Sequence, residues 1–348
     1  MTMRVAMLYD VDDIRIESRA VPQLRDGELL VQTRASGICS GDIMGWYVRR
    51  KAPLVLGHEP AGTIVAVGGG APPTDDDGRA FVVGERVAVH HHAPCFACVA
   101  CRRGDHVQCA TWRASAIEPG GLAEYFRVPR ENVRDTLRLP DAVSFADGSL
   151  VEPLGCVMKS IRRSGLRSGD NVLVIGLGVM GLMHVAVARD RGARAFGTDF
   201  RAERRAYAET LGAAMIGPDD IAALKRATDG RGAEVVICGP GTPEALRNAI
   251  AAAAPGGTIV MFTPLEPGVA LSLDPNDLYF RDLRLIASYS CGPEDTREAL
   301  AAIARGVVTV EKLHATTFPL EQAAQAYRAL AEAQIVKPIV IFEPSLFD

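Results

Sequence analysis

The sequence predicts an α/β protein with a β-rich domain and a second domain built on a doubly wound parallel sheet. Short β-rich runs separated by turn residues, among them Val5–Leu8 and Leu29–Ala35, fill the first part of the chain. From Asn171 onward, apolar runs alternate with alanine-rich helical segments, a pattern typical of a parallel sheet with helices on both faces. The last apolar run, Ile335–Phe342, again has the character of a strand, so we expect the chain to return to the β-rich domain.

Length and composition fit two folded domains and argue against several classes of protein. The chain has 348 residues and 48% of them are apolar, enough for sizeable cores. A formal net charge of -4 without a long basic block argues against nucleic-acid binding. The longest apolar stretches, such as 172–188, are interrupted by glycines and a histidine, which argues against a membrane span. The N-terminus lacks a charged leader followed by an apolar segment, so we expect a cytoplasmic protein.

A glycine-rich turn joins the strand Asn171–Ile175 to a helix and indicates dinucleotide binding. Its sequence is Gly176-Leu177-Gly178-Val179-Met180-Gly181. Gly176 permits the tight turn, Gly178 lets backbone amides approach a pyrophosphate, and Gly181 allows the helix to pack closely on the strand. The helix N-terminus offers N–H groups to the phosphates. The alternative is that these glycines only turn a strand into a helix.

Asp199, at the end of the next strand, stands at the distance expected for a carboxylate that binds the adenosine ribose. Such a carboxylate would repel a 2′-phosphate, so we expect NAD rather than NADP. Three nearby arginines weaken that preference, because a guanidinium can hold a phosphate. They are Arg201, Arg204 and Arg205.

Four closely spaced cysteines predict a structural zinc site. Cys95, Cys98, Cys101 and Cys109 have the spacing C-x2-C-x2-C-x7-C. Four thiolates this close in sequence can surround one ion tetrahedrally, at about 2.3 Å each. In a reducing compartment such a cluster more often binds metal than forms disulfides. Four unrelated buried cysteines are one alternative, and an iron–sulfur cluster is another, although the last spacing does not match a ferredoxin run.

A second set of residues offers a zinc site with an open position. Cys39, His58, Glu59 and Glu152 supply a thiolate, an imidazole and two carboxylates, and three such ligands leave a fourth place for water or substrate. Taken singly, each has an ordinary explanation as a buried thiol, a core histidine or a surface acid. The run His90–His92 is different, because successive strand residues point to opposite faces and cannot all bind one ion. We expect those histidines to be solvated or hydrogen-bonded.

These motifs, in this order, resemble the zinc-containing medium-chain alcohol dehydrogenase family across essentially the whole chain. The resemblance rests on the motif at 57–62 with Gly68 six residues on, the four-cysteine cluster and the glycine-rich turn. The sequence Glu-Pro-Leu at 152–154 and Asp199 resemble the sorbitol, threonine and related polyol dehydrogenases. Classical alcohol dehydrogenases carry a cysteine where Glu152 falls.

The resemblance implies a GroES-like catalytic domain and a Rossmann NAD-binding domain, with zinc and nicotinamide in a cleft between them. The catalytic domain is expected to comprise 1–153 and 288–348, with a structural zinc lobe at about 93–112. The Rossmann domain is expected to comprise 154–287. Two zinc ions per chain, NAD, a small alcohol or ketone substrate, and a homodimer or homotetramer follow from the same resemblance.

The resemblance also assigns roles to single residues. Cys39 and His58 match the catalytic zinc ligands, while Glu59 and Glu152 match carboxylates that bind zinc directly or through its water. The basic residue near the adenosine ribose is Arg204. Lys337 matches a basic residue that reaches the pyrophosphate; for both cations an ordinary exposed position is the alternative.

The implied function is hydride transfer between a secondary alcohol, with a polyol or sugar-like substrate as best guess, and NAD. A threonine-type amino-alcohol dehydrogenase, or a zinc-free reductase or binding relative, is the alternative. One position departs from the family, which usually carries Ser or Thr two residues after the zinc cysteine as a proton relay. Here that residue is Gly41, so the relay falls to Ser40, Asp42, Glu59 or ordered water. Trp46, Tyr47 and Trp112 are candidates to line the substrate pocket. We expect Arg49–Lys51 to be a solvated charge run, with contact to an anionic substrate group as the alternative.

Overall fold

The computed structural model describes residues 1–218 and 220–343, which divide into two compact units. The first unit joins Met1–Gly155 to the chain from Cys291 onward, and the second is Cys156–Ser290. Helix α6 (Val151–Ser164) begins in the first unit and continues in the second.

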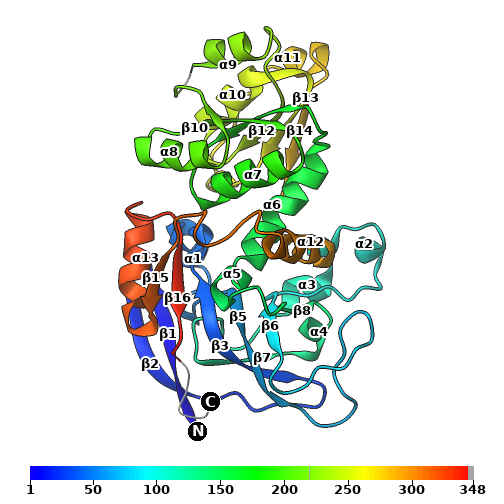
Figure 1. Ribbon diagram of the computed structural model, residues 1–348, viewed down its shortest axis with the longest axis vertical. Helices are drawn as coiled ribbons and strands as arrows, with labels where there is room; N and C mark the ends of the chain where they lie inside the picture. The colour runs from blue at the N-terminus through cyan, green and yellow to red at the C-terminus, as the bar shows by residue number, and fades with distance from the viewer. Residues whose placement is uncertain (219, 344–348) are drawn as a thin grey trace. The chain divides into compact units, whose positions relative to one another are not determined.

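The first unit is mostly β-structure with short helices (Figure 1). Its strands are β1 (Thr2–Asp10), β2 (Asp13–Ala20), β3 (Leu29–Gly37), β4 (Leu54–Val55), β5 (Glu59–Val67), β6 (Arg86–Val89), β7 (Tyr125–Val128), β8 (Thr136–Arg138), β15 (Thr316–Pro319) and β16 (Pro338–Ile341). Its helices are η1 (Ser40–Ile43), α1 (Gly45–Val48), α2 (Val99–Arg102), η2 (His106–Gln108), α3 (Ala110–Ala114), α4 (Arg130–Val133), α5 (Phe145–Gly148), α12 (Pro293–Ala304), η3 (Leu320–Gln322) and α13 (Ala323–Ala331).

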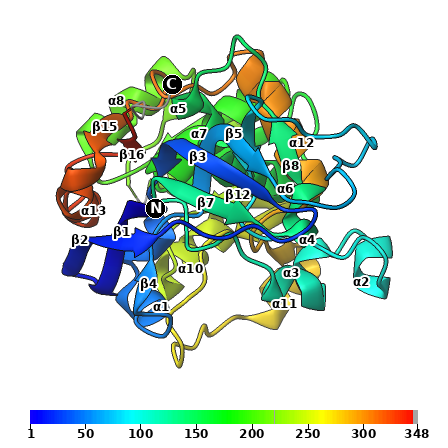
Figure 2. The ribbon, with the colours of Figure 1, turned by 90° about the horizontal axis from the view of Figure 1, so that it is seen from below.

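Two sheets organise this unit. The larger has seven strands in the order β15-β16-β3-β5-β6-β8, with β7 also paired to β3, and the smaller has the order β2-β1-β4 (Figure 2). The antiparallel register sets Gly37 opposite both Glu59 on β5 and Ile339 on β16. The end of β3, the start of β5 and the start of β16 therefore meet at one place in the sheet. Helix α13 packs on β16 beside them (Figure 1).

The core of the first unit lies in two main apolar clusters. One gathers buried side chains of β3, β5, β6 and β7, among them Val31, Ile64 and Phe126. The other joins β1 to α13 and includes Leu8 and Tyr327. Side chains alternate between the faces of a strand, so each cluster fixes which residues point toward the site described below.

The second unit is a parallel sheet between helices, as the strand–helix alternation predicts. Its strands, in the order β11-β10-β9-β12-β13-β14, are β9 (Asn171–Ile175), β10 (Arg194–Thr198), β11 (Ala214–Met215), β12 (Ala233–Cys238), β13 (Ala253–Met261) and β14 (Arg284–Ala287). Its helices are α7 (Val179–Asp190), α8 (Ala202–Thr210), α9 (Ile221–Ala227), α10 (Pro243–Ala252) and α11 (Pro275–Phe280) (Figure 1). All five strand pairs are parallel.

The predicted α/β class, with a β-rich part and a parallel sheet, is therefore confirmed. The strand run predicted at Ile335–Phe342 is shorter in the structure, because only Pro338–Ile341 forms ladder bonds. In the described part of the chain, no helix combines the length and the apolarity that crossing a membrane requires.

Candidate metal and dinucleotide sites

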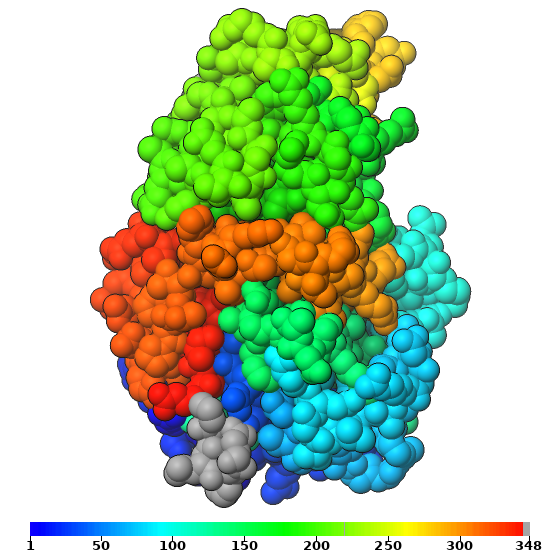
Figure 3. Space-filling model, viewed as in Figure 1, coloured from blue at the N-terminus to red at the C-terminus, as the bar shows by residue number. Residues whose placement is uncertain are grey.

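The four predicted zinc-lobe cysteines come together in one segment of the first unit, residues 95–109. Cys98 precedes α2, Cys101 lies within it, and Cys109 ends η2 and precedes α3. This segment bulges from the surface of the unit as the cyan region of Figure 3. Short helices separated by tight turns bring residues close in space that a strand of the same length would hold apart.

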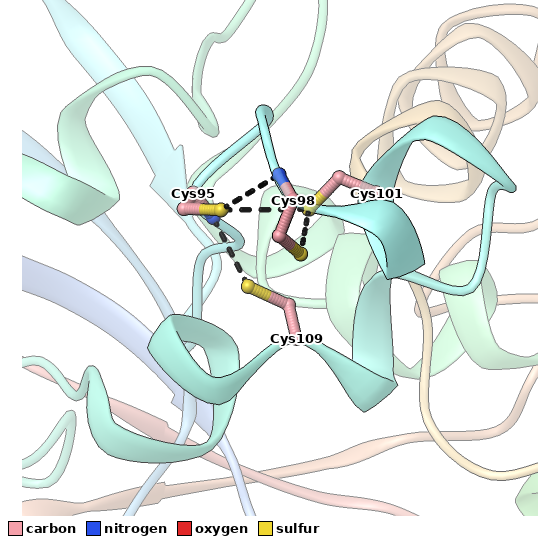
Figure 4. Close-up of side chains that lie close together, drawn as sticks. All are labelled: Cys95, Cys98, Cys101 and Cys109. Atoms are coloured by element: carbon pink, nitrogen blue, oxygen red, sulfur yellow. Dashed lines mark hydrogen bonds between the residues drawn. The ribbon is translucent and has the colours of Figure 1, made fainter.

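The spacing between the sulfur atoms fits a single tetrahedral ion (Figure 4). The Sγ atoms of Cys95 and Cys101 are 3.9 Å apart, and those of Cys98 and Cys101 are 3.5 Å apart. Four sulfurs at about 2.3 Å from a zinc ion lie about 3.8 Å from one another. All four ligand atoms lie within 4.8 Å of one another. The cluster thus has the donors and the dimensions of a closed structural zinc site.

Backbone N–H groups aim at these sulfurs as they would at thiolates. The N–H groups of Cys98 and Cys95 donate to the Sγ atoms of Cys95 and Cys109, each at 3.3 Å. Burial opposes ionisation of Cys109, but the N–H groups of Cys95 and Trp112 outweigh it and lower its pKa to about 6. Burial and the neighbouring thiols raise the pKa of Cys101 to about 12. A zinc ion would favour the thiolate at every one of the four.

Trp112 is one of the candidates to line the substrate pocket. It is buried in the core of the zinc lobe with Val107, Cys101 and Cys109, and its ring centroid lies 4.4 Å from that of His92. The short helix α3 turns it inward, which the sequence did not reveal. The charged run 49–51 is exposed at Arg49 and Arg50, as expected, and each of its members contacts a neighbouring side chain.

The second metal-binding set assembles at the end of β3 and the start of β5. Cys39 lies just before η1, and His58 and Glu59 lie at the entry to β5. The ligand atoms of these three residues all lie within 4.8 Å of one another. Glu59 is buried, and in the described structure its Oε1 has no hydrogen-bond partner. A buried carboxylate oxygen without a partner is costly, and a cation in this group would satisfy it.

Lys337 lies beside Glu59. The buried Nζ of this lysine, which the resemblance places at the cofactor pyrophosphate, forms an ion pair with Glu59 Oε2 and donates to the carbonyl of Ile38 at 3.1 Å. The sheet register explains this pairing, because Lys337 immediately precedes β16 and so lies next to the β3–β5 pair. The pair fits at this place because residue 37 is a glycine: a Cβ there would come within 1.9 Å of Glu59 Oε2.

Acidic groups surround the imidazole of His58. Its Nδ1 lies 3.7 Å from Oδ2 of the buried Asp42. Burial opposes the charged imidazole, but Asp42 and Cys39 outweigh it and raise the pKa of His58 well above its ordinary value. Burial also raises the pKa values of Cys39, Asp42 and Glu152. This concentration of acidic groups is what a divalent cation would neutralise.

Glu152 belongs to a different group in the structure. Its carboxylate is within 4.8 Å of the ligand atoms of His90 and Cys291, and the group of Cys39, His58 and Glu59 does not include it. Sequence reasoning missed this second association. His90 did lie in a histidine run expected to be hydrogen-bonded, and its Nδ1 indeed contacts Asp135. Cys291 lies far from the other cysteines in the sequence and belongs to no recognised motif, so the sequence did not indicate that it could bind a metal.

Gly41, where the sequence departs from the family pattern, lies beside the thiol of Cys39. The backbone N–H of Gly41 donates to Cys39 Sγ at 3.3 Å. A Cβ at Gly41 would meet that sulfur at 3.4 Å, an ordinary contact. A residue with a Cβ therefore fits at this position. Ser40, the neighbouring hydroxyl, is half-buried at the start of η1.

The glycine-rich turn in the second unit has the geometry of a pyrophosphate cradle. Gly176 adopts a φ of +86°, which a residue with a Cβ rarely adopts. A Cβ at Gly181 would come within 2.0 Å of the carbonyl oxygen of Gly176, so helix and strand approach closely there. Gly178 caps the N-terminus of the twelve-residue α7, whose first residues are Val179 and Met180. A Cβ at Gly178 would have only the far end of Arg204 in reach, at 3.9 Å, so the backbone there is open to a ligand.

Asp199 closes the other side of this turn. Its Oδ2 accepts from the N–H of Leu177 at 2.7 Å, and its Oδ1 accepts from the N–H of Arg201 at 2.8 Å. The Nη1 of Arg204 lies 3.8 Å from Asp199 Oδ2. Arg205 instead donates to the carbonyl oxygens of Asp199 and Phe200. The fixed carboxylate at the end of β10 suits a ribose diol, with Arg204 at its side.

Comparison with known proteins agrees with this description. Residues 25–141 match the alcohol dehydrogenase GroES-like domain, and residues 179–305 match the zinc-binding dehydrogenase family. Sorbitol dehydrogenase of Bacillus subtilis is 30% identical, over 93% of this chain and 92% of its own. D-xylulose reductase A of Aspergillus oryzae is 28% identical, over 96% and 95%. The crystal structure of a Sinorhizobium meliloti protein bound to NADP has a TM-score of 0.86 at 28% identity, covering 98% and 99% of the two chains. The predicted GroES-like and Rossmann-type fold class is confirmed.

Proposed function

This chain belongs to the zinc-containing medium-chain alcohol dehydrogenase family, and from that premise we propose that it transfers a hydride between a polyol or sugar-like secondary alcohol and NAD. Family membership makes it an oxidoreductase that acts on the CH–OH group of a small molecule. The observation that carries the proposal is the group of Cys39, His58 and the buried Glu59, whose carboxylate has one oxygen without a hydrogen-bond partner in the described structure.

We assign the catalytic zinc to that group and a second zinc to the four cysteines. Three ligands of this kind leave a fourth position for the substrate oxygen. When bound there, zinc acts as a Lewis acid and lowers the pKa of an alcohol. Glu152 is the fourth residue that the resemblance assigns to this site, and we place it outside the direct ligand set.

The surrounding residues orient the ligands and move the proton. Asp42 lies 3.7 Å from Nδ1 of His58, and we assign it the role of the carboxylate that accompanies a metal-binding histidine. Lys337 pairs with one oxygen of Glu59 and leaves the other without a hydrogen-bond partner in the described structure, so that oxygen is available to bind. Ser40 is our candidate for the hydroxyl that accepts the alcohol proton, since it is the hydroxyl adjacent to Cys39 in the chain.

We assign the dinucleotide to the turn at 176–181, with Asp199 on the adenosine ribose and Arg204 beside it. A carboxylate fixed by two backbone N–H groups favours a ribose diol over a 2′-phosphate, and this supports NAD. The hydride chemistry itself belongs to the nicotinamide. The domain assignment follows: the first unit is the catalytic domain and the second the NAD-binding domain.

The substrate class rests on the named relatives, which are a sorbitol dehydrogenase and a D-xylulose reductase. We further propose a homo-oligomer of two or four chains in the cytoplasm. Strand β14 ends its sheet among the described strands, and Tyr279 and Phe280 beside it are 75% and 79% exposed. An edge strand next to exposed aromatic side chains favours association with a second copy. A reducing compartment would keep the four zinc-lobe cysteines as thiolates.

The test is NADH formation by zinc-replete protein on a panel of polyols, sugars, amino alcohols and simple secondary alcohols. We expect turnover on a polyol or sugar that a zinc chelator abolishes and added zinc restores. Turnover confined to amino alcohols would overturn the substrate class. Turnover that survives complete removal of zinc would overturn the assigned chemistry.

A further inference from the structure

A third group of metal-binding side chains lies buried in the first unit. His90, Glu152 and Cys291 have exposed fractions of 3%, 7% and 0%. Their ligand atoms lie within 4.8 Å of one another, as do those of the two sites already assigned. Imidazole, carboxylate and thiolate are the three ligand types that catalytic zinc sites combine.

His90 is oriented as a metal ligand. Its Nδ1 lies 2.7 Å from Oδ2 of the fully buried Asp135, which leaves Nε2 to face the other two ligands. Metal-binding histidines almost always donate their second ring nitrogen to a carboxylate or carbonyl in this way. Asp135 is itself held by the hydroxyl of Thr296 at 3.3 Å. The side-chain amide of Asn132 donates to the carbonyl oxygens of His90 and His91, which fixes the backbone.

The distance between two of the ligand atoms matches a tetrahedral zinc ion. Cys291 Sγ lies 3.6 Å from His90 Nε2. A sulfur at about 2.3 Å and a nitrogen at about 2.05 Å from one tetrahedral zinc are about 3.6 Å apart. Gly155 lets the thiol sit here, because a Cβ at that position would crowd Cys291 Sγ at 3.2 Å.

A small cavity adjoins the group. Its volume is about 10 Å³, room for about one water-sized sphere. His90 and Glu152 line it together with Asp135, Glu59 and apolar side chains such as Val89. The thiolate and the carboxylate of the ligand group carry two negative charges, which a divalent cation would balance in this buried place.

We propose that His90 Nε2, Cys291 Sγ and the carboxylate of Glu152 bind a divalent transition-metal ion, with zinc as the occupant in the protein as purified. Binding converts the Cys291 thiol to a thiolate and releases its proton to solvent, and His90 binds as the neutral imidazole. The site is separate from the four-cysteine cluster and from the group of Cys39, His58 and Glu59, so it does not depend on the proposed function.

The direct test is a crystal of the full chain grown with zinc, with anomalous data collected on both sides of the zinc absorption edge. We expect a peak about 2.3 Å from Cys291 Sγ and about 2.05 Å from His90 Nε2. Zinc peaks at the four cysteines and at Cys39 with none at Cys291 would overturn this inference and leave the proposed function standing. A peak at Cys291 with none at Cys39 would support this inference and overturn the proposed catalytic zinc site.

Zinc content in solution provides a test that needs no crystal. We expect Cys291→Ser to lose up to about one zinc per chain relative to wild type, while Cys238→Ser retains the wild-type content. Cys238 is a buried thiol of the second unit and is not part of a described metal-binding group, so it controls for the loss of a buried thiol. Circular dichroism establishes that both variants are folded. A folded Cys291→Ser with unchanged zinc would overturn the inference; if that variant does not fold, the anomalous map of the wild type decides.

Discussion

Lys337 and Glu59 form an ion pair in which both side chains are almost completely shielded from water. The pair joins the residue before β16 to the first residue of β5, across the end of β3. One oxygen of Glu59, Oε2, faces the lysine, and the other, Oε1, has no hydrogen-bond partner in the described part of the chain. The sheet register thus orients a proposed zinc ligand through a residue 278 positions away in the chain.

Lys337→Met should destabilise the protein by about 3 kcal/mol or more, because it leaves the Glu59 carboxylate buried and unpaired. The measurement is the free energy of unfolding in denaturant. Adding Glu59→Gln to that variant should recover part of the loss, since the uncompensated charge disappears. Lys312→Met is the control, because Lys312 is exposed. Equal effects of the two lysine substitutions would contradict the assigned role of the buried pair.

Gly37→Ala should displace Glu59 and reduce zinc affinity at the proposed catalytic site. A Cβ at Gly37 would lie 1.9 Å from Glu59 Oε2 and 2.9 Å from Lys337 Nζ, so the pair must move. We expect zinc at this site to bind at least about tenfold more weakly, as for loss of an outer-sphere partner. Competition with a chelator measures the affinity. Gly217→Ala, where the new Cβ meets an ordinary contact of 3.6 Å, should bind zinc as wild type does.

Cys109→Ser should remove about one zinc ion per chain and loosen the zinc lobe. The small core there consists largely of the cysteines themselves with Val107 and Trp112, so little apolar packing remains without the ion. Hydrogen exchange should rise over residues 95–114 and stay unchanged in strand β9. Retention of the wild-type zinc content would show that these four sulfurs do not share an ion.

The sequence predicted the elements of the fold better than the associations between them. Hydrophobic periodicity located the parallel sheet, and the spacing of Cys95 to Cys109 was sufficient for the zinc lobe because those ligands are close in the chain. Register between distant strands is a tertiary property, so the neighbour of Lys337 could not be read from its local sequence. The same limit hid the meeting of His90 with Cys291, which are 201 residues apart.

Asp199→Ser should shift the cofactor preference toward NADP. The substitution removes the carboxylate that repels a 2′-phosphate and leaves Arg204, now 3.8 Å from that carboxylate, available to bind one. We expect the ratio of kcat/KM for NADP to that for NAD to rise by about tenfold or more, which corresponds to about 1.4 kcal/mol. Asp141→Ser, an exposed carboxylate of the first unit, should leave the ratio unchanged. An unchanged ratio in Asp199→Ser would place the ribose elsewhere.

His184 should make the second unit labile to acid. The ring is fully buried, its Nδ1 contacts the carbonyl of Met180 and its Nε2 the hydroxyl of Ser160, each at 2.6 Å. A carbonyl only accepts, so Nδ1 carries the proton and Nε2 accepts from Ser160 in the neutral ring. Burial lowers the pKa of His184 from 6.5 to about 4.

The sign of the pH effect follows from that lowered pKa. Between about pH 6.5 and pH 4 the unfolded chain binds a proton at His184 and the folded chain does not, so stability falls as the pH falls. The contribution of His184 to the free energy of unfolding is fully present above the pKa of its unfolded state. About 2 kcal/mol of it is lost by about pH 5. In His184→Gln, which cannot titrate, the difference between the free energies of unfolding at about pH 7.5 and pH 5 should be smaller by that amount. If the two proteins lose stability equally over this range, His184 is not the group responsible.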